Sequence, residues 1–182
     1  MKLIILDRDG VINEDFDSYI KSPEEWIPIP GSLEAIASLK LAGWKVAVAS
    51  NQSGLARGLF DQSTLNAIHT KMHRALLDHN TSIDYLVYCP HGPDDMCDCR
   101  KPKLGLYRQI SGYFRVELTD VPVVGDSSRD LIAAASVGAR PILVRTGKGN
   151  RTLSNEKLPQ GLSVYEDLNE VAKSLLSEWE IF

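Results

Sequence analysis

The chain has 182 residues, of which 43% are hydrophobic and 24% charged, the proportions of an ordinary soluble globular protein. Its formal net charge of −4 argues against nucleic acid as a partner, because nucleic-acid-binding proteins usually carry a basic excess. The sequence contains no N-terminal apolar signal region and no apolar run of about eighteen residues. We therefore expect a cytoplasmic protein with no membrane segment, folded as a single domain over residues 1–182 and monomeric by default.

The first predicted element is a buried parallel strand made of the apolar residues 3–6. It ends in Asp7-Arg8-Asp9-Gly10, and because side chains alternate along a strand, Asp7 and Asp9 are predicted to point to the same side. Two carboxylates so close repel each other unless a cation or a shared proton intervenes. Taken alone, the pair also fits a simple turn, where aspartate is common.

A flap and one helix are predicted between the first strand and the second. Residues 13–30 have mixed polarity and contain prolines, which cannot continue a long helix, so they are predicted to form a loop or a small flap. Ser32 is predicted to cap the helix that follows, and Gly43 to end it. This leaves no room for a large cap domain, so we expect an open site that is shaped by loops.

Strands and helices alternate over the rest of the chain. Further strands are predicted at 44–49, 85–88, 121–124 and 142–144, and further helices from 63 onward and at 105–114, 129–137 and 168–179. Such alternation predicts the α/β class: a three-layer α/β/α sandwich with a mainly parallel, Rossmann-like sheet that is covered on both faces.

Polar side chains follow the predicted strands in succession. They are Asp7 and Asp9, then Ser50 and Asn51, then Arg100 and Lys101, and finally Asp126 and Asp130. Because the carboxyl ends of parallel strands meet at one edge of the sheet, these distant residues can converge there. Acids, a hydroxyl, an amide and fixed cations together suit a site that handles a phosphate with a divalent metal ion.

The three cysteines lie close together, at Cys89, Cys97 and Cys99, with His91 between them. An odd, clustered set in a chain without a secretory signal indicates a metal site rather than disulfides. Three thiolates and one imidazole form a closed tetrahedral set for a structural zinc ion. Each pair brackets a single residue, which is tighter than the spacing of common zinc fingers. Three incidental thiols beside a loop histidine are therefore the alternative.

Four motifs over residues 4–130 together resemble those of the haloacid dehalogenase (HAD) superfamily of phosphohydrolases. They are Asp-x-Asp-Gly-Val after the first strand, Ser-Asn after the second, a lysine ahead of a helix, and Gly-Asp-x-x-x-Asp after a late strand. The segments Asp-Arg-Asp-Gly-Val-Ile-Asn, Asn-Gln-Ser-Gly-Leu-Ala-Arg-Gly, Cys-Pro-His and Cys-Arg-Lys-Pro are similar to those of the D-glycero-D-manno-heptose 1,7-bisphosphate 7-phosphatase family. The subgroup that contains this family also includes the histidinol-phosphate phosphatases, and the resemblance extends to the zinc loop.

The resemblance implies roles for three of the acids. Asp7 would be the nucleophile that forms an aspartyl phosphate, and Asp9 would be the general acid and then the general base. Mg²⁺ would bind Asp7, Asp126 and the backbone carbonyl of Asp9.

The resemblance also implies which groups bind the phosphate. Ser50, the backbone amide of Asn51 and the ammonium of Lys101 would hold the phosphoryl oxygens. Asp130 would orient Lys101 or the metal site, although an acid in the first turn of a helix is equally well explained by the helix dipole.

Arg100 is the candidate for binding the remainder of the substrate, because a guanidinium binds phosphates and hydroxyls through a fork of donors. Arg57 is a weaker candidate of the same kind. The expected reaction is hydrolysis of the 7-phosphate of a heptose 1,7-bisphosphate, in the synthesis of heptose precursors of lipopolysaccharide. The alternative is a histidinol-phosphate phosphatase of histidine biosynthesis, and the sequence does not distinguish the two anomers of the heptose.

Three other classes fit the sequence less well. A signalling receiver domain has no motif like Gly-Asp-Ser-Ser-Arg-Asp at residues 125–130. A nucleic-acid 3′-phosphatase is disfavoured by the acidic net charge. A catalytically inactive binding protein should have lost Asp7, Asp9 or Asp126, and all three are present.

Overall fold

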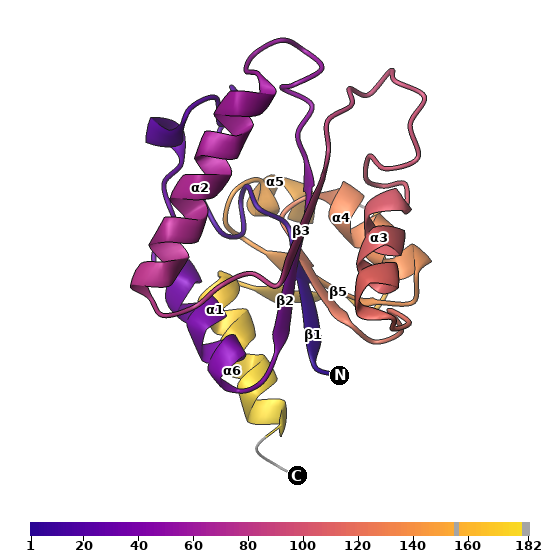
Figure 1. The fold of residues 1–182 in the computed structure, drawn as a ribbon. Helices are drawn as coiled ribbons and strands as arrows, with labels where there is room; N and C mark the ends of the chain where they lie inside the picture. Colours follow the sequence, from indigo (N-terminus) through magenta and orange to yellow (C-terminus); the bar gives the residue numbers. More distant parts are fainter. Residues whose placement is uncertain (155–156, 180–182) are drawn as a thin grey trace.

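The structure, a computed structural model, describes residues 1–154 and 157–179. Its centre is a parallel sheet of six strands in the order β3-β2-β1-β4-β5-β6 (Figure 1). The strands are β1 (Leu3–Leu6), β2 (Lys45–Asn51), β3 (Tyr85–Cys89), β4 (Pro122–Gly125), β5 (Arg140–Val144) and β6 (Ser163–Tyr165). Because β1 pairs in parallel with β2 on one side and β4 on the other, the loops that follow these three strands meet at one edge.

Helices cover both faces of this sheet. On one face lie α1 (Ser32–Leu41), α2 (Gln62–Asp78) and α6 (Leu168–Trp179), and on the other lie α3 (Gly105–Phe114) and α4 (Ser128–Ser136) (Figure 1). The remaining helical segments are a short 3-10 turn η1 (Pro23–Glu25) and α5 (Gly149–Leu153). This arrangement confirms the predicted three-layer α/β/α sandwich.

The alternation of side chains along β1 explains why this strand is apolar at every position. Ile4 and Leu6 belong to the core beneath α1, α2 and α6, whereas Leu3 and Ile5 belong to the core beneath α3 and α4. Burial of each such side chain contributes roughly 1.5–3 kcal/mol. The strand that leads to Asp7 is thereby fixed from both sides.

Three local predictions were wrong or incomplete. Ser32 does not cap α1: Gly31 is the N-cap with φ +84°, and the Ser32 hydroxyl instead donates to the carbonyl of Ile12 (2.6 Å), which joins α1 to the segment just before the flap. Strand β2 continues through Asn51, because its last residues still pair with β3. The short elements α5 and β6 were not predicted.

The flap lies between β1 and α1. Residues 13–30 form an irregular segment that contains only η1, and in the described ranges nothing larger separates β1 from α1.

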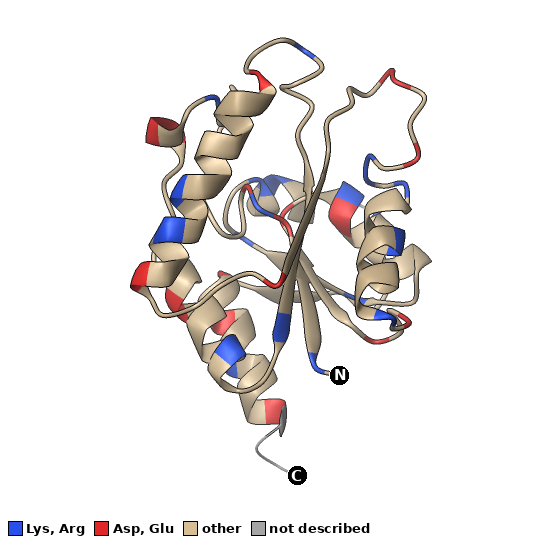
Figure 2. Ribbon diagram, viewed as in Figure 1, with Lys and Arg blue, Asp and Glu red and all other residues tan. Residues whose placement is uncertain are grey.

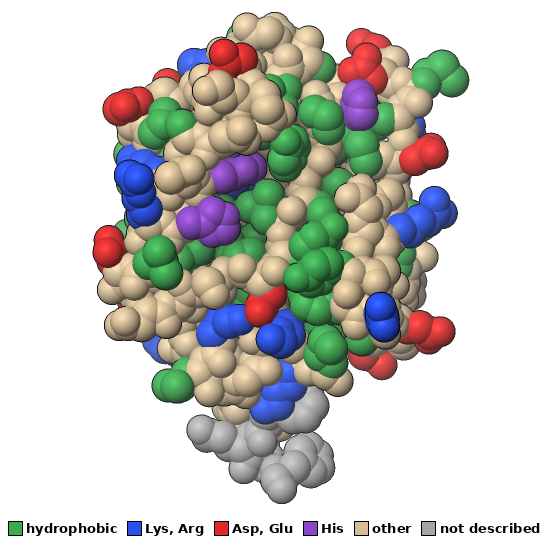
Figure 3. All heavy atoms as spheres, viewed as in Figure 1, with side chains coloured by type: hydrophobic (Ala, Val, Ile, Leu, Met, Phe, Trp, Pro, Cys, Tyr) green, Lys and Arg blue, Asp and Glu red, His purple; other side chains and the backbone are tan. Residues whose placement is uncertain are grey.

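At the β3 edge, Figure 3 shows hydrophobic side chains in a band between α2 and α3, where the rings of Tyr85 and Tyr113 stack with centroids 4.0 Å apart. Within the described residues, no helix combines the length and apolar character that a membrane span requires.

Candidate active site

A cavity of about 130 Å³ lies where β1, β2 and β4 end. Its lining includes seven of the predicted site residues: Asp7, Asp9, Asn51, Arg100, Lys101, Asp126 and Asp130. The lining also includes residues that the sequence did not single out: Asp15, Phe16, Asp17, Tyr19, Ser53, Ser127, Arg129 and Lys148. Figure 2 shows acidic and basic residues together on the loops that follow the strands. The structure therefore brings residues from four distant parts of the chain to one polar cavity.

Lys101 is the buried cation of this cavity, with 2% of its side chain exposed. Its Nζ lies 3.1 Å from Oδ1 of Asp7 and 2.6 Å from Oδ1 of Asp130, and it donates to the carbonyl of Ala49 (2.6 Å). Burial disfavours the charged ammonium, but the carboxylates of Asp130 and Asp7 outweigh burial and raise the pKa of Lys101. A fixed positive charge thus lies beside the predicted nucleophile.

Asp130 combines the two roles that the sequence left open. One carboxylate oxygen pairs with Lys101, while the other accepts from the backbone N–H (3.1 Å) and the hydroxyl (2.7 Å) of Ser127, which closes a capping box at the start of α4. Gly125 is required beside it, because a Cβ there would collide with the Asp130 side chain. Since both oxygens of Asp130 have partners, this residue anchors Lys101.

Three carboxylates crowd the floor of the cavity. One oxygen each of Asp7, Asp126 and Asp130 lie within 4.8 Å of one another. Burial and then the charge of Asp130 raise the pKa of Asp7 to about 7, and burial and then Asp7 raise the pKa of Asp126 well above its usual range. A bound divalent cation would favour the ionised carboxylates and lower the pKa values of Asp7 and Asp126 again. Because Asp130 is fully occupied by Lys101 and Ser127, Asp7 and Asp126 are the side chains that fit Mg²⁺.

Asp126 is held by a loop that sequence reasoning missed. The backbone N–H of Lys148 donates to Oδ2 of Asp126 (2.8 Å), and the hydroxyl of Thr152 donates to its carbonyl (2.6 Å). Gly147 has φ +57°, and a Cβ at this position would collide with the same carboxylate oxygen. The β5–α5 connection therefore orients the carboxylate that we assign to the metal.

Asp9 lines the same cavity, but its carboxylate has different partners from that of Asp7. Oδ1 accepts from Arg8 Nε (2.8 Å) and Asn13 Nδ2 (2.9 Å), and Oδ2 accepts from Arg8 Nη2 (3.1 Å) and Gln52 Nε2 (3.1 Å). Burial opposes ionisation, but the charge and hydrogen bonds of Arg8 prevail and lower the pKa of Asp9. Asp7 and Asp9 thus both line the cavity, Arg8 is the cation that offsets the repulsion predicted for them, and their environments shift their pKa values in opposite directions.

The end of β2 holds Lys101 through its backbone. The side chain of Asn51 donates to the carbonyl of Lys101 (3.1 Å) and accepts from its N–H (3.0 Å). Ser50 is 1% exposed and does not line the cavity, and its Oγ accepts from Gln52 Nε2 (2.8 Å). Of the predicted phosphate-binding residues, Ser50 is thus the one that lies behind the cavity wall.

Cationic side chains gather at the mouth of the cavity. Arg100, Arg129 and Lys148 line it. Burial and then the positive charge of Arg129 lower the pKa of Arg100. Arg57 does not line the cavity, but its guanidinium lies 5.9 Å from the centre of the Tyr19 ring, which does. Such a mouth favours an anionic group on the substrate.

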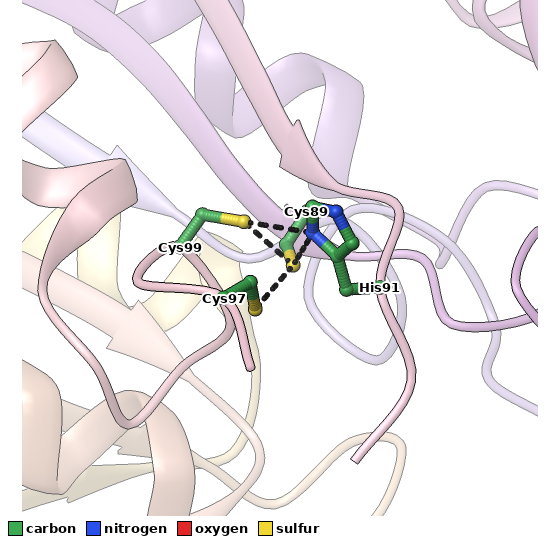
Figure 4. A group of neighbouring side chains, drawn as sticks. All are labelled: Cys89, His91, Cys97 and Cys99. Atoms are coloured by element: carbon green, nitrogen blue, oxygen red, sulfur yellow. Dashed lines mark hydrogen bonds between the residues drawn. The ribbon is translucent and has the colours of Figure 1, made fainter. Parts of the chain in front are cut away.

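The predicted zinc ligands form one cluster beside β3 (Figure 4). The thiol of Cys89 lies 3.5 Å from Nδ1 of His91, 3.8 Å from the thiol of Cys97 and 2.9 Å from that of Cys99. The three cysteines are free thiols, and burial followed by the Cys99 hydrogen bond raises the pKa of Cys89 to about 12. Three thiols and one imidazole nitrogen directed at a common point suit zinc, which releases the thiol protons on binding.

This cluster stands next to the cationic mouth. Cys99 is followed directly by Arg100 and Lys101, and Nη1 of Arg100 donates weakly to the carbonyl of His91 (3.5 Å). Because the loop between Cys89 and Cys99 has no regular secondary structure, a metal at its base would fix the position of both cations.

The chain is similar to known phosphatases. Residues 98–171 match the family described as "HAD-hyrolase-like". The D-glycero-beta-D-manno-heptose-1,7-bisphosphate 7-phosphatase of Bordetella bronchiseptica is 60% identical to this chain, over 98% of this chain and 99% of the relative. That of Pseudomonas putida is 53% identical, over 97% of this chain and all of the relative.

Two solved structures extend the comparison. The D,D-heptose 1,7-bisphosphate phosphatase from B. bronchiseptica, complexed with magnesium and phosphate, superposes with a TM-score of 0.96 at 60% identity, covering 98% of this chain and 99% of that one. The enzyme from Burkholderia thailandensis superposes with a TM-score of 0.78 at 48% identity, covering 97% and 99% of the two chains.

Proposed function

The chain belongs to the D-glycero-beta-D-manno-heptose-1,7-bisphosphate 7-phosphatase family of HAD-like hydrolases, and from this membership we propose how its residues divide the reaction. It is a magnesium-dependent phosphatase that hydrolyses the 7-phosphate of D-glycero-D-manno-heptose 1,7-bisphosphate. The observation that carries the assignment of roles is the position of Asp7, which lies in the cavity with the Lys101 ammonium 3.1 Å from its carboxylate.

Asp7 is the proposed nucleophile. A carboxylate oxygen of Asp7 attacks the phosphorus of the 7-phosphate while the bond from phosphorus to the sugar oxygen breaks, and an aspartyl phosphate forms. Lys101 supports this step, since its fixed charge favours the ionised form of Asp7 and lies where phosphoryl oxygens would approach. Asp7, Asp126 and the backbone carbonyl of Asp9 would hold Mg²⁺, which would supply positive charge that offsets the repulsion between carboxylate and phosphate.

Asp9 is the proposed acid and base. In the first step it donates a proton to the departing sugar oxygen, and in the second it takes a proton from the water that attacks the aspartyl phosphate, which releases inorganic phosphate and restores Asp7. The hydrogen bonds that Asp9 accepts from Arg8, Asn13 and Gln52 favour its ionised form, which is the form that takes a proton from water in the second step.

The transferred phosphoryl group is proposed to bind Lys101, the backbone N–H of Asn51 and the hydroxyl of Ser50. Lys101 and Asn51 line the cavity. Ser50 lies just behind it, but because its Oγ accepts from Gln52, its own proton remains available to a phosphoryl oxygen. Asp130 contributes indirectly by holding Lys101 in place.

The second phosphate of the substrate is proposed to bind at the cationic mouth, with Arg100 as its main partner and Arg129 beside it. Histidinol phosphate has no second phosphate to place there, and this disfavours the alternative activity. The names of the relatives specify the beta anomer, so we propose that anomer as the preferred substrate.

Several broader properties are proposed on the same basis. The reaction would serve heptose precursor synthesis for lipopolysaccharide, in the cytoplasm, where three free thiols remain reduced. The cluster of Cys89, His91, Cys97 and Cys99 is proposed to hold one structural zinc ion. We also propose that residues 1–182 act as one domain and as a monomer.

Steady-state assays of the wild type and of Asp7→Asn test this proposal. The wild type should show the highest kcat/KM for the beta anomer of the heptose bisphosphate, followed by the alpha anomer and then histidinol phosphate. Asp7→Asn should fold but lose most activity, because a neutral amide is a poor nucleophile, and beryllofluoride should bind the wild type alone. Near-normal turnover by Asp7→Asn would refute the covalent route, and equal rates on histidinol phosphate would refute the role of the cationic mouth.

A further inference from the structure

Arg8 is a charged residue inside the protein. Its side chain is 0% exposed, although it lies between two acids that face an open cavity. Buried arginine occurs only where its donors have partners. Two of its nitrogens, Nε and Nη2, form a fork onto the two oxygens of Asp9, at 2.8 and 3.1 Å.

The third nitrogen of this guanidinium meets a histidine from a different element. Nη1 of Arg8 lies 3.1 Å from Nε2 of His69, which belongs to α2 and is 8% exposed. Because arginine has donors only, Nε2 must be the acceptor, so His69 is neutral and carries its proton on Nδ1. Burial and then the Arg8 charge lower the pKa of His69 to about 4, in agreement with a neutral ring.

The three residues thus form a chain of hydrogen bonds from the core to the cavity. The fork fixes the rotation of the Asp9 carboxylate only if the guanidinium plane is itself fixed. Within the described contacts, the side-chain partner that Arg8 has besides Asp9 is His69. The reaction as proposed above has no use for His69, which does not line the cavity.

We propose that His69 is a positioning residue: by accepting a hydrogen bond from Arg8, it holds the guanidinium in the plane that orients the Asp9 carboxylate for proton transfer. This inference rests on the proposed function, because it presupposes that Asp9 exchanges protons with the leaving oxygen and the water. His69 itself does not touch the substrate.

Substitutions of His69 distinguish a role in orienting Arg8 from a role in packing the core. His69→Phe keeps a ring of similar size but removes the acceptor, while the amide oxygen of His69→Gln can take the place of Nε2. His73→Phe, one turn further along α2 and exposed, is the matched control. Thermal unfolding of each variant establishes that it is folded.

The measurement is kcat/KM for two substrates with different leaving groups. The heptose bisphosphate needs a proton on its departing alkoxide, whereas p-nitrophenyl phosphate releases a stable phenolate and does not. We expect His69→Phe to lower kcat/KM about tenfold for the heptose bisphosphate and less than about twofold for p-nitrophenyl phosphate. The tenfold loss is a part of the rate enhancement that general acid catalysis provides. His69→Gln should recover most of the loss, and His73→Phe should match the wild type.

The Asp9→Asn background completes the test. If His69 acts through Asp9, adding His69→Phe to Asp9→Asn should cause no further loss. Equal losses on both substrates, a His69→Gln as impaired as His69→Phe, or additive effects in the double variant would overturn the inference. If Asp9→Asn alone shows no dependence on the leaving group, the proposed acid role of Asp9 fails, and the inference fails with it. A selective loss in Asp9→Asn without one in His69→Phe refutes the inference alone.

Discussion

Replacement of Gly147 by alanine should weaken magnesium binding, although this residue has no functional side chain. Its φ of +57° lies in the left-handed region, and an added Cβ would collide with Oδ2 of Asp126 and lie 2.5 Å from Cα of Gly10. Ordinary contact begins at 3.4 Å, so the two backbone segments must separate by about 0.9 Å. That shift moves the proposed metal ligand and the N–H of Lys148 that holds it.

The expected magnitudes follow from these contacts. The left-handed conformation costs alanine about 1 kcal/mol, and the overpacking adds about 1–3 kcal/mol to the loss of unfolding free energy. Disturbing the support of a metal ligand typically weakens metal affinity about 10- to 100-fold. The apparent Mg²⁺ concentration for half-maximal activity should therefore rise by at least about tenfold in Gly147→Ala.

Gly43→Ala is the matched control for this substitution. Gly43 also has a positive φ (+84°), but an added Cβ there meets nothing within 4 Å, so it should show the conformational cost alone. Magnesium titrations of activity and urea unfolding of both variants provide the comparison. The same magnesium dependence in both variants would show that the close approach of Gly147 to Asp126 does not govern metal binding.

Three further predictions concern other parts of the site. Lys101→Met should lower kcat at least about 100-fold, because Asp7 and Asp130 lose the ammonium between them. The control Lys45→Met, at the first residue of β2, should leave kcat unchanged. Cys97→Ser should lose the expected content of about one zinc per chain, measured by elemental analysis, while the neighbouring exposed Met96→Ser should retain it. The pKa of His69 is about 4 in the folded protein, below its ordinary value, so its contribution to stability is present above pH 6.5 and is lost as the pH falls toward 4. Between pH 7 and 4.5 the wild type should therefore lose more unfolding free energy than His69→Gln, by about 2 kcal/mol in urea titrations, and parallel losses would contradict the assigned neutral ring.

The layers of the fold could be predicted because their signals are local. A strand buried on both faces is apolar at every position, as residues 3–6 are, and helices of ten residues or more show their apolar spacing. Elements that lack such a pattern were missed. Strand β6 has three half-buried residues, and α5 has five residues of which only Gly149 is buried. The hydroxyl of Thr152 ties α5 to the carbonyl of Asp126, a contact from outside the segment that no local pattern encodes.

The residues of the site were predictable to the extent that they follow strands. Asp7 and Asp126 do so, and their convergence follows from parallel topology, whereas Lys101 lies beyond the cysteine loop and is held by the side chain of Asn51. Arg8 could not be predicted as buried, because a charged residue between two acids ordinarily indicates exposure. Its burial depends on His69, some sixty positions away and on another element. Ser32 was assigned to a cap for the same reason, since its partner Ile12 lies twenty positions earlier, outside its own helix.

The position of β1 at the centre of the sheet has a consequence for how the protein is made. Residues 3–6 leave the ribosome well before β4 (Pro122–Gly125), which is one of their two neighbours in the sheet. The carboxylate of Asp126 and the N–H of Lys148 that holds it emerge later still. A nascent chain therefore carries Asp7, the proposed nucleophile, without its partners in the site until these later segments have emerged. Phosphatase activity should appear abruptly, only after the segment around residue 148 has been synthesised and has folded onto the first strand.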